Sequence, residues 1–69
     1  METVQDHINL GMAFTVSKNY AMAIKEFEKA LSINPEDAEV QAHLANAYIY
    51  KGDYEKAVAS YEKSLKINP

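Results

Sequence analysis

Apolar and polar residues follow one another along the chain with a helical period. Between Val4 and Val16 the apolar residues recur every three or four positions, and polar residues fill the opposite face. The pattern stops at residues 17–19 and resumes at residue 20. Because this spacing gathers apolar side chains on one side of a helix, it predicts two amphipathic helices in succession.

The second predicted helix divides most clearly into two faces. The residues predicted to point inward are Ala23, Ile24, Phe27, Ala30 and Leu31. The charged residues predicted to point outward are Lys25, Glu26, Glu28 and Lys29. Lys and Glu three residues apart can pair on such an exposed face.

Capping residues mark where the first two helices begin. Thr3, with Asp6 three residues later, is typical of a capping box in which both side chains satisfy free amides of the first turn. Asn19 is a good N-cap for the second helix. We therefore expect a turn at residues 17–19.

The second half of the chain also contains residues typical of helix caps. Asn34 followed by Pro35 predicts a cap and a first helical residue, so a third helix is expected to start there. Gly52 is typical of a left-handed C-cap, and Asp53 of an N-cap for a fourth helix. The remaining turns are expected at residues 33–36 and 51–53. Connections this short make successive helices antiparallel neighbours.

The chain also repeats itself. A shift of 34 residues aligns residues 1–35 with 35–69 and gives eleven identical pairs, among them Leu10 with Leu44 and Tyr20 with Tyr54. Unrelated segments of ordinary composition would give about two or three. The sequence is therefore an internal duplication of a helix hairpin.

At these positions the chain resembles the tetratricopeptide repeat family. The residues that carry the resemblance in the first copy are Leu10, Gly11, Phe14, Tyr20, Ala23, Phe27, Ala30 and Pro35. Those in the second copy are Leu44, Ala45, Tyr48, Tyr54, Ala57, Tyr61, Ser64 and Pro69. His7 and Gln41 stand where the family often has Trp. Gly52 matches the usual hairpin glycine in the second copy, and Lys18 stands at the equivalent position of the first copy.

The expected fold is all-α, with four helices in two tandem antiparallel hairpins. The resemblance implies a fragment of a right-handed α-solenoid. At 69 residues the chain forms one domain, 1–69, with a first repeat at about 4–35 and a second at about 36–69. The small residues Gly11, Ala23, Ala45 and Ala57 should let the helices approach closely, and the aromatic residues Phe14, Phe27, Tyr48 and Tyr61 should pack beside them.

Composition narrows the function. The sequence has seven Lys, ten Asp and Glu, and no Arg. This acidic balance argues against a nucleic-acid partner. No apolar run is long enough for a membrane helix, and the acidic start is unlike a signal peptide, so we expect a cytoplasmic protein without a membrane partner. There is no Cys to form a disulfide or a thiolate metal site.

The residues offer little for catalysis. Asp6 and His7 are adjacent and point about 100 degrees apart on a helix, so they cannot pair, and we expect His7 to be a half-buried core residue. Glu39 and His43 share a helix face and could hold a metal or form a weak hydrogen bond. With no third ligand in view, we predict no enzyme, no catalytic residue, no metal site and no cofactor.

The resemblance implies instead a non-catalytic module that binds a protein or peptide segment. In tetratricopeptide arrays the first helix of each hairpin lines a concave groove. The groove residues expected here are Gln5, Ile8, Asn9, Met12, Thr15, Val16, Glu39, Ala42, His43, Asn46, Ile49 and Tyr50. Several are apolar, so the groove could receive an apolar or amphipathic partner, or be covered by a chain neighbour or another copy.

The family's best-known ligand mode is a clamp of Lys and Asn that holds the C-terminal carboxylate of a chaperone peptide. In this sequence Ile8, Met12 and His43 stand where the clamp residues would be. An adaptor for chaperone tails is therefore not expected.

A second hypothesis is self-association into a homo-oligomer. A repeat buries its apolar face against its neighbours. The second repeat is expected to cover the apolar face of the first, whereas the equivalent face of the second repeat has no further repeat to cover it. We therefore expect an uncovered edge and a dimer, stacked end to end or domain-swapped. The residues expected at this edge are Tyr48, Val58, Tyr61 and Leu65.

Overall fold

The computed structural model describes residues 2–69, and within this range it contains four α-helices and no strand. The helices are α1 (Val4–Val16), α2 (Tyr20–Ile33), α3 (Ala38–Lys51) and α4 (Tyr54–Ile67). The predicted all-α fold is confirmed.

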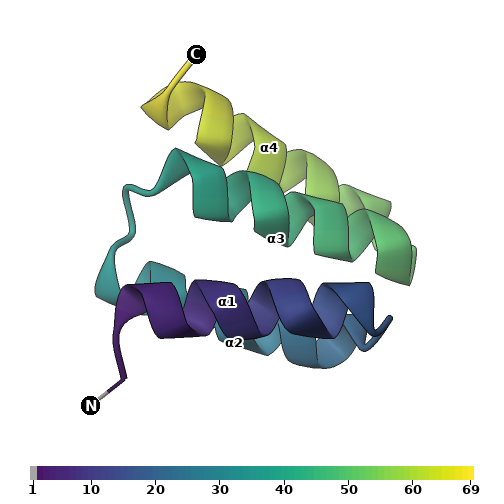
Figure 1. Ribbon diagram of the computed structural model, residues 1–69. Helices are drawn as coiled ribbons and strands as arrows, with labels where there is room; N and C mark the ends of the chain where they lie inside the picture. Colours follow the sequence, from purple (N-terminus) through teal and green to yellow (C-terminus); the bar gives the residue numbers. More distant parts are fainter. Residues whose placement is uncertain (1) are drawn as a thin grey trace.

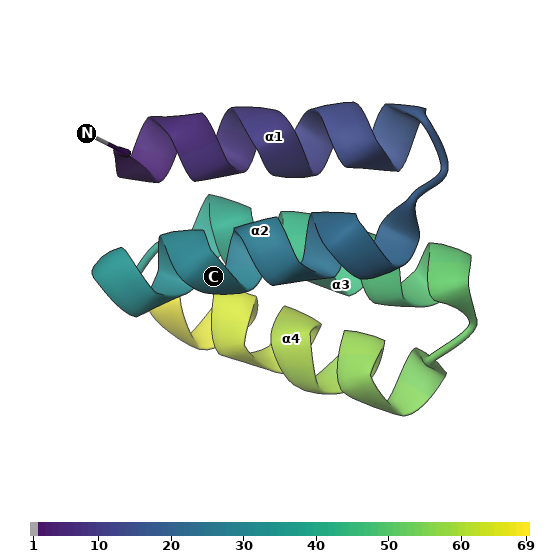
Figure 2. The same ribbon diagram turned by 90° about the horizontal axis from the view of Figure 1, so that it is seen from below.

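The helices form two antiparallel hairpins, one stacked on the other. Figure 1 shows α1 and α2 below α3 and α4, with the short connections at alternating ends. Viewed from below, α2 lies over α3, while α1 and α4 lie at the outer edges (Figure 2). The α2–α3 packing joins the two hairpins, and α1 meets α3 along a lighter contact. The molecule measures 30 × 24 × 14 Å.

The core lies between α2, α3 and the inner faces of the two hairpins. Phe27 on α2 and Val40 on α3 are the largest fully buried side chains. The other buried core residues are Ala23, Ile24, Ala30, Leu44, Ala47, Tyr48 and Ala57. Phe14 packs against this cluster but is half-buried, as is Tyr61. The predicted inward face of α2 is thus confirmed.

Close approach within the first hairpin depends on Gly11. A Cβ atom placed on Gly11 would lie 2.5 Å from a ring carbon of Phe27, which is closer than any real contact. At the equivalent positions the second repeat has Ala45 and Tyr61. Tyr61 is half-buried, and its hydroxyl donates a hydrogen bond to Asn46.

Three of the predicted helix starts are correct. Thr3 and Asp6 form the capping box, with each side chain accepting a hydrogen bond from the other residue's amide. Asn19 caps α2 by accepting from the amide of Met22. Asp53 precedes α4 as expected, although its side chain makes no capping hydrogen bond.

The predicted start of the third helix at Pro35 is wrong. Helix α3 begins at Ala38, and its N-cap is Asp37, whose carboxylate accepts a hydrogen bond from the amide of Val40 at 3.1 Å. Asn34 instead ends α2, and its amide donates to the carbonyl of Ala30. Two capping residues lie close together here, and the second one starts the helix.

The two hairpin turns have the same backbone geometry. The amide of Asn19 donates to the carbonyl of Phe14, and 34 residues later Asp53 donates to Tyr48, both at 2.8 Å. Gly52 adopts φ +92° in its turn, and Lys18 adopts φ +66° at the equivalent position. A left-handed conformation costs a residue with a Cβ roughly 1–2 kcal/mol. The first turn is therefore strained where the second is not.

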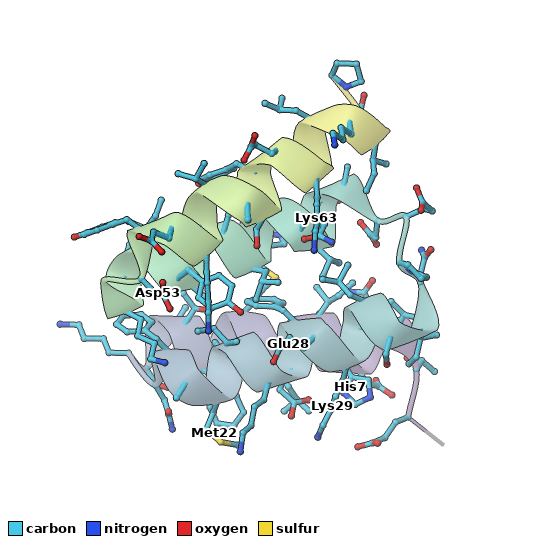
Figure 3. The ribbon with its side chains drawn as sticks, turned by 180° about the vertical axis from the view of Figure 1, so that it is seen from behind. His7, Met22, Glu28, Lys29, Asp53 and Lys63 are labelled. Carbon is cyan, nitrogen blue, oxygen red and sulfur yellow. The ribbon has the colours of Figure 1, made fainter. Side chains whose placement is uncertain are left out.

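The prediction that Glu26 points to solvent is wrong, and His7 is buried more completely than expected. Both side chains are enclosed between α1 and α2, with His7 Nδ1 2.8 Å from Glu26 Oε1. Lys29 Nζ lies 3.3 Å from the other carboxylate oxygen of Glu26. Figure 3 shows His7 and Lys29 close together at the edge of this hairpin. A buried polar pair thus lies between the two helices of the first hairpin.

Candidate partner-binding groove

A groove runs between α1 and α3 on the side of the molecule opposite the α2–α4 face. It has two adjoining parts that share Met12 and His43. The first part encloses about 230 Å³ and is lined by Met12, Thr15, Val16, Phe27, His43, Asn46 and Tyr50. The second encloses about 180 Å³ and is lined by Gln5, Ile8, Met12, Asp37, Glu39, Val40 and His43.

Nine of the twelve predicted groove residues line these two parts. The other three are Asn9, Ile49 and Ala42, which is half-buried. Asn9 is exposed and accepts a hydrogen bond from Gln5 Nε2 at 3.0 Å, and Ile49 is 38% exposed. The helical period therefore brought most of the expected set to one surface.

Phe27, Asp37 and Val40 also line the groove but were not predicted there. Phe27 belongs to α2 and contacts the groove from that helix. The spacing of residues along α1 and α3 cannot reveal such a contribution. Asp37 was expected inside a helix that began at Pro35. Recognising Asp37 as the N-cap would have placed it at the start of α3, beside the groove.

Two stacked ring pairs fix the shape of the groove. The ring of His43 stacks on that of Phe27, with centroids 5.6 Å apart and planes at 15°. Tyr50 stacks on Tyr20 with a centroid separation of 5.3 Å. In each pair a residue of α3 is held by a residue of α2. Stacked pairs of this kind add about 0.5–1.5 kcal/mol beyond their buried area. The groove wall is therefore formed before any partner arrives.

The first part of the groove presents apolar surface to solvent. Met12 is 46% exposed, Tyr50 58% and Val16 84%. Single exposed apolar residues are ordinary, but three lining one hollow are less so. Covering this part of the surface would remove apolar area from water, which favours binding.

Charge is distributed unevenly along the groove. Asp37 and Glu39 line the end where α1 and α3 begin, and no lysine is among the described lining residues. Lys18 and Lys51 lie at the opposite end, where the two helices finish. The acidic side chains that line the groove are therefore gathered at one end.

Glu39 and His43 lie one turn apart on α3. Glu39 Oε1 lies 3.8 Å from His43 Nε2, too far for a hydrogen bond but within range of an ion pair if the ring is protonated. Residues 2–69 include no group of three or more His, Cys, Asp or Glu side chains arranged to hold a metal ion.

The four residues predicted at the self-association edge differ in exposure. Val58 is 57% exposed and Leu65 59%, whereas Tyr61 is half-buried. The expectation that Tyr48 is uncovered is wrong, since this side chain belongs to the core. Burial raises the pKa of the Tyr48 hydroxyl, and the nearby carboxylates of Glu28 and Asp53 add to the effect.

A larger cleft of about 420 Å³ lies on the other side of the molecule, between α2 and α4. Its floor is formed by α3 through Gln41, Leu44 and Tyr48. Glu28 stands on its α2 side and Lys63 on its α4 side (Figure 3). Apolar residues also line this cleft, but Glu28, Lys56 and Lys63 at its rim make it more polar than the first part of the α1–α3 groove.

No helix among residues 2–69 has the length and hydropathy needed to cross a membrane. The comparison with curated proteins gave no match. The family model of the tetratricopeptide repeat matches residues 17–69, which is more than half of the chain. Tetratricopeptide repeats are in general non-catalytic modules that bind proteins or peptides, and the two hairpins described above have their architecture. The chain belongs to the tetratricopeptide repeat family.

Proposed function

We propose that the groove between α1 and α3 binds a peptide or helical segment of another protein. The observation that carries this proposal is the exposed apolar hollow formed by Met12, Val16 and Tyr50. Because the ring stacks already hold its walls, little ordering entropy is lost when a partner binds. A cytoplasmic setting, expected from the sequence, stays a prediction.

The partner we propose is an amphipathic segment with one large apolar side chain and a nearby basic residue. The apolar side chain would fill the hollow beside Met12 and Tyr50. The basic residue would lie near Asp37 and Glu39. Each helix start contributes only about half a positive charge, which these two carboxylates outweigh. Opposite charge at the groove end would set the direction of the segment and speed its association.

The same residues disfavour a partner that is recognised by its C-terminal carboxylate. Ile8, Met12 and His43 occupy the positions at which a carboxylate clamp would place its donors, and the described lining includes no lysine. A buried carboxylate without a partner is costly. An acidic C-terminal peptide should therefore bind no better than its amidated form, which fluorescence polarisation can measure.

A selection from a library of random 12-residue peptides tests the proposal. Peptides are selected on the wild-type chain and depleted on the Met12→Glu variant. This change places a charge in the hollow, and because Met12 is partly exposed the helix should still form. We expect groove-dependent binders that combine a large apolar residue with Lys or Arg. Selected peptides that bind both chains equally would contradict the groove. Binders that depend on Met12 but are acidic would contradict only the proposed partner chemistry.

Self-association is the second candidate function. It is favoured by the exposure of Val58 and Leu65 on one face of α4, away from the groove. Both side chains are large and apolar, and burying the surface that each still exposes would favour association.

A further inference from the structure

Equivalent positions of the two repeats, 34 residues apart, differ in burial in a way that separates two kinds of contact. Some positions are buried in both repeats, such as Gly11 with Ala45 and Ala23 with Ala57. Gly11 lies against Phe27 of its own hairpin. Several other apolar positions are buried in one repeat and exposed in the other, and where they are buried they belong to or pack against the core cluster shared by the two hairpins.

On the first helix of each repeat, the second kind of position is buried in α3 and exposed in α1. Leu44 is 6% exposed, whereas Leu10 is 43% exposed. Ala47 is fully buried, whereas Ala13 is exposed. Both pairs are identical in residue type. At these two positions α1 therefore exposes the same apolar residues that α3 buries.

On the second helix of each repeat the relation is reversed. Ile24 on α2 is 7% exposed, whereas its counterpart Val58 on α4 is 57% exposed. Leu31 is partly buried against the core, whereas Leu65 is 59% exposed. The outer face of α4 thus carries the surface with which α2 covers α3.

We propose that α4 of one copy packs on α1 of a second copy in the arrangement in which α2 packs on α3 within one chain. The proposal rests on the second candidate function above and adds the surface on α1 that receives α4. The two surfaces differ, so the contact is head to tail and each pair keeps one free surface at either end. Association is therefore open-ended, and a closed two-fold dimer is not its product.

Two differences from the internal interface make the contact weaker than the original. Asp6 of α1 stands where α3 has the buried Val40, and its carboxylate is held in the capping box of α1. Val58 is one methylene smaller than Ile24. A charged group at the rim and a smaller apolar side chain both reduce the gain on association. The assembly should therefore dissociate on dilution.

Two variants that each block one surface give a decisive test. Leu10→Glu blocks α1 and leaves α4 free, and Val58→Glu does the reverse. Sedimentation equilibrium is measured for the wild-type chain, for each variant alone and for their equimolar mixture. We expect the wild-type mass to rise with concentration beyond twice the monomer mass. Each variant alone should stay monomeric, and the mixture should form a heterodimer of twice the monomer mass and no larger species.

Val16→Glu provides the matched control, because Val16 is an exposed apolar residue of the groove and not of the proposed interface. It should associate as the wild type does, and circular dichroism should show all three variants to be as helical as the wild type. A Leu10→Glu chain that still dimerises would overturn the head-to-tail contact. So would a mixture that stays monomeric, a wild-type monomer at all concentrations, or loss of association in Val16→Glu. Peptide binding in the groove, measured on the Leu10→Glu monomer, is a separate readout and can succeed where association fails.

Discussion

His7 on α1 and Glu26 on α2 are joined by a buried hydrogen bond, with Nδ1 of His7 2.8 Å from Oε1 of Glu26. An ionised carboxylate can only accept, so the Nδ1 proton of His7 is the donor. This hydrogen bond holds the pKa of Glu26 below its ordinary value of 4.5, against the opposing effect of burial, and Lys29 adds to the lowering. The pair therefore links the two helices of the first hairpin by charge as well as by packing.

The second hairpin lacks this link. Gln41 and Ser60 occupy the positions of His7 and Glu26, and both are buried. Among the described residues, Oε1 of Gln41 has no hydrogen-bond partner. The buried hydrogen bond of the first hairpin therefore has no counterpart in the second.

Replacing Glu26 by alanine should destabilise the chain by about 1–3 kcal/mol, because the Nδ1 proton of His7 would be buried without an acceptor. Glu26→Gln should cost less, since an amide oxygen can still accept. Urea unfolding followed by circular dichroism measures both. Glu28→Ala is the control, because Glu28 is exposed on the same helix. Equal stability of Glu26→Ala and Glu28→Ala would show that the buried pair contributes nothing.

The lowered pKa of Glu26 predicts a specific loss of stability in acid. The unfolded chain binds a proton at Glu26 near pH 4.5, whereas the folded chain binds it only at lower pH. The contribution of the pair is therefore complete above the unfolded pKa and is lost as the pH falls through the folded pKa. Between about pH 6 and pH 3, the wild type should lose more unfolding free energy than Glu26→Gln. Parallel pH profiles for the two chains would contradict this.

Lys18→Gly should stabilise the chain by about 1 kcal/mol, because glycine adopts the left-handed conformation of this turn without steric cost. The converse change, Gly52→Lys, should destabilise by a similar amount. A Cβ at Gly52 would meet no atom within 4 Å, so backbone strain alone accounts for that loss. Thermal unfolding of both variants measures the pair of effects. Shifts of the same sign would be incompatible with this account.

Gly11→Ala should destabilise the chain by about 1–3 kcal/mol, because the added methyl group would overlap the ring of Phe27. Phe27→Leu removes the part of the ring in question. In the double variant the losses should therefore be less than additive, by at least about 0.5 kcal/mol. Additive losses would show that the two residues do not compete for the same space.

The sequence was sufficient to predict what local rules and periodicity determine. Four helices, their turns and the inward face of α2 follow from spacing and caps, which act within a few residues. The start of α3 was misplaced because Asn34 and Asp37 are both good caps and only the structure decides between them. Glu26 was misplaced because a pattern of polar and apolar residues treats every carboxylate as exposed. Its partner, His7, lies on another helix.

The candidate groove was predictable to a similar extent. Side chains on one face of α1 and α3 follow from the helical period, so most of the expected set lies there. The contributions of Phe27 and Tyr20 come from α2 through ring stacking, which no spacing within one helix reveals. Exposure at the outer faces of α1 and α4 also depends on how the hairpins stack. That is why Tyr48 was expected at an edge but lies in the core.

The most direct test of the groove proposal is a nuclear magnetic resonance titration of the isotope-labelled chain with a peptide chosen by the selection described above. If the segment binds between α1 and α3, the largest shift changes should fall on Met12, Val16, His43 and Tyr50. Signals from the outer face of α4, including Val58 and Leu65, should stay in place. Shift changes concentrated on α4 or in the cleft between α2 and α4, with the groove signals unchanged, would contradict the proposal.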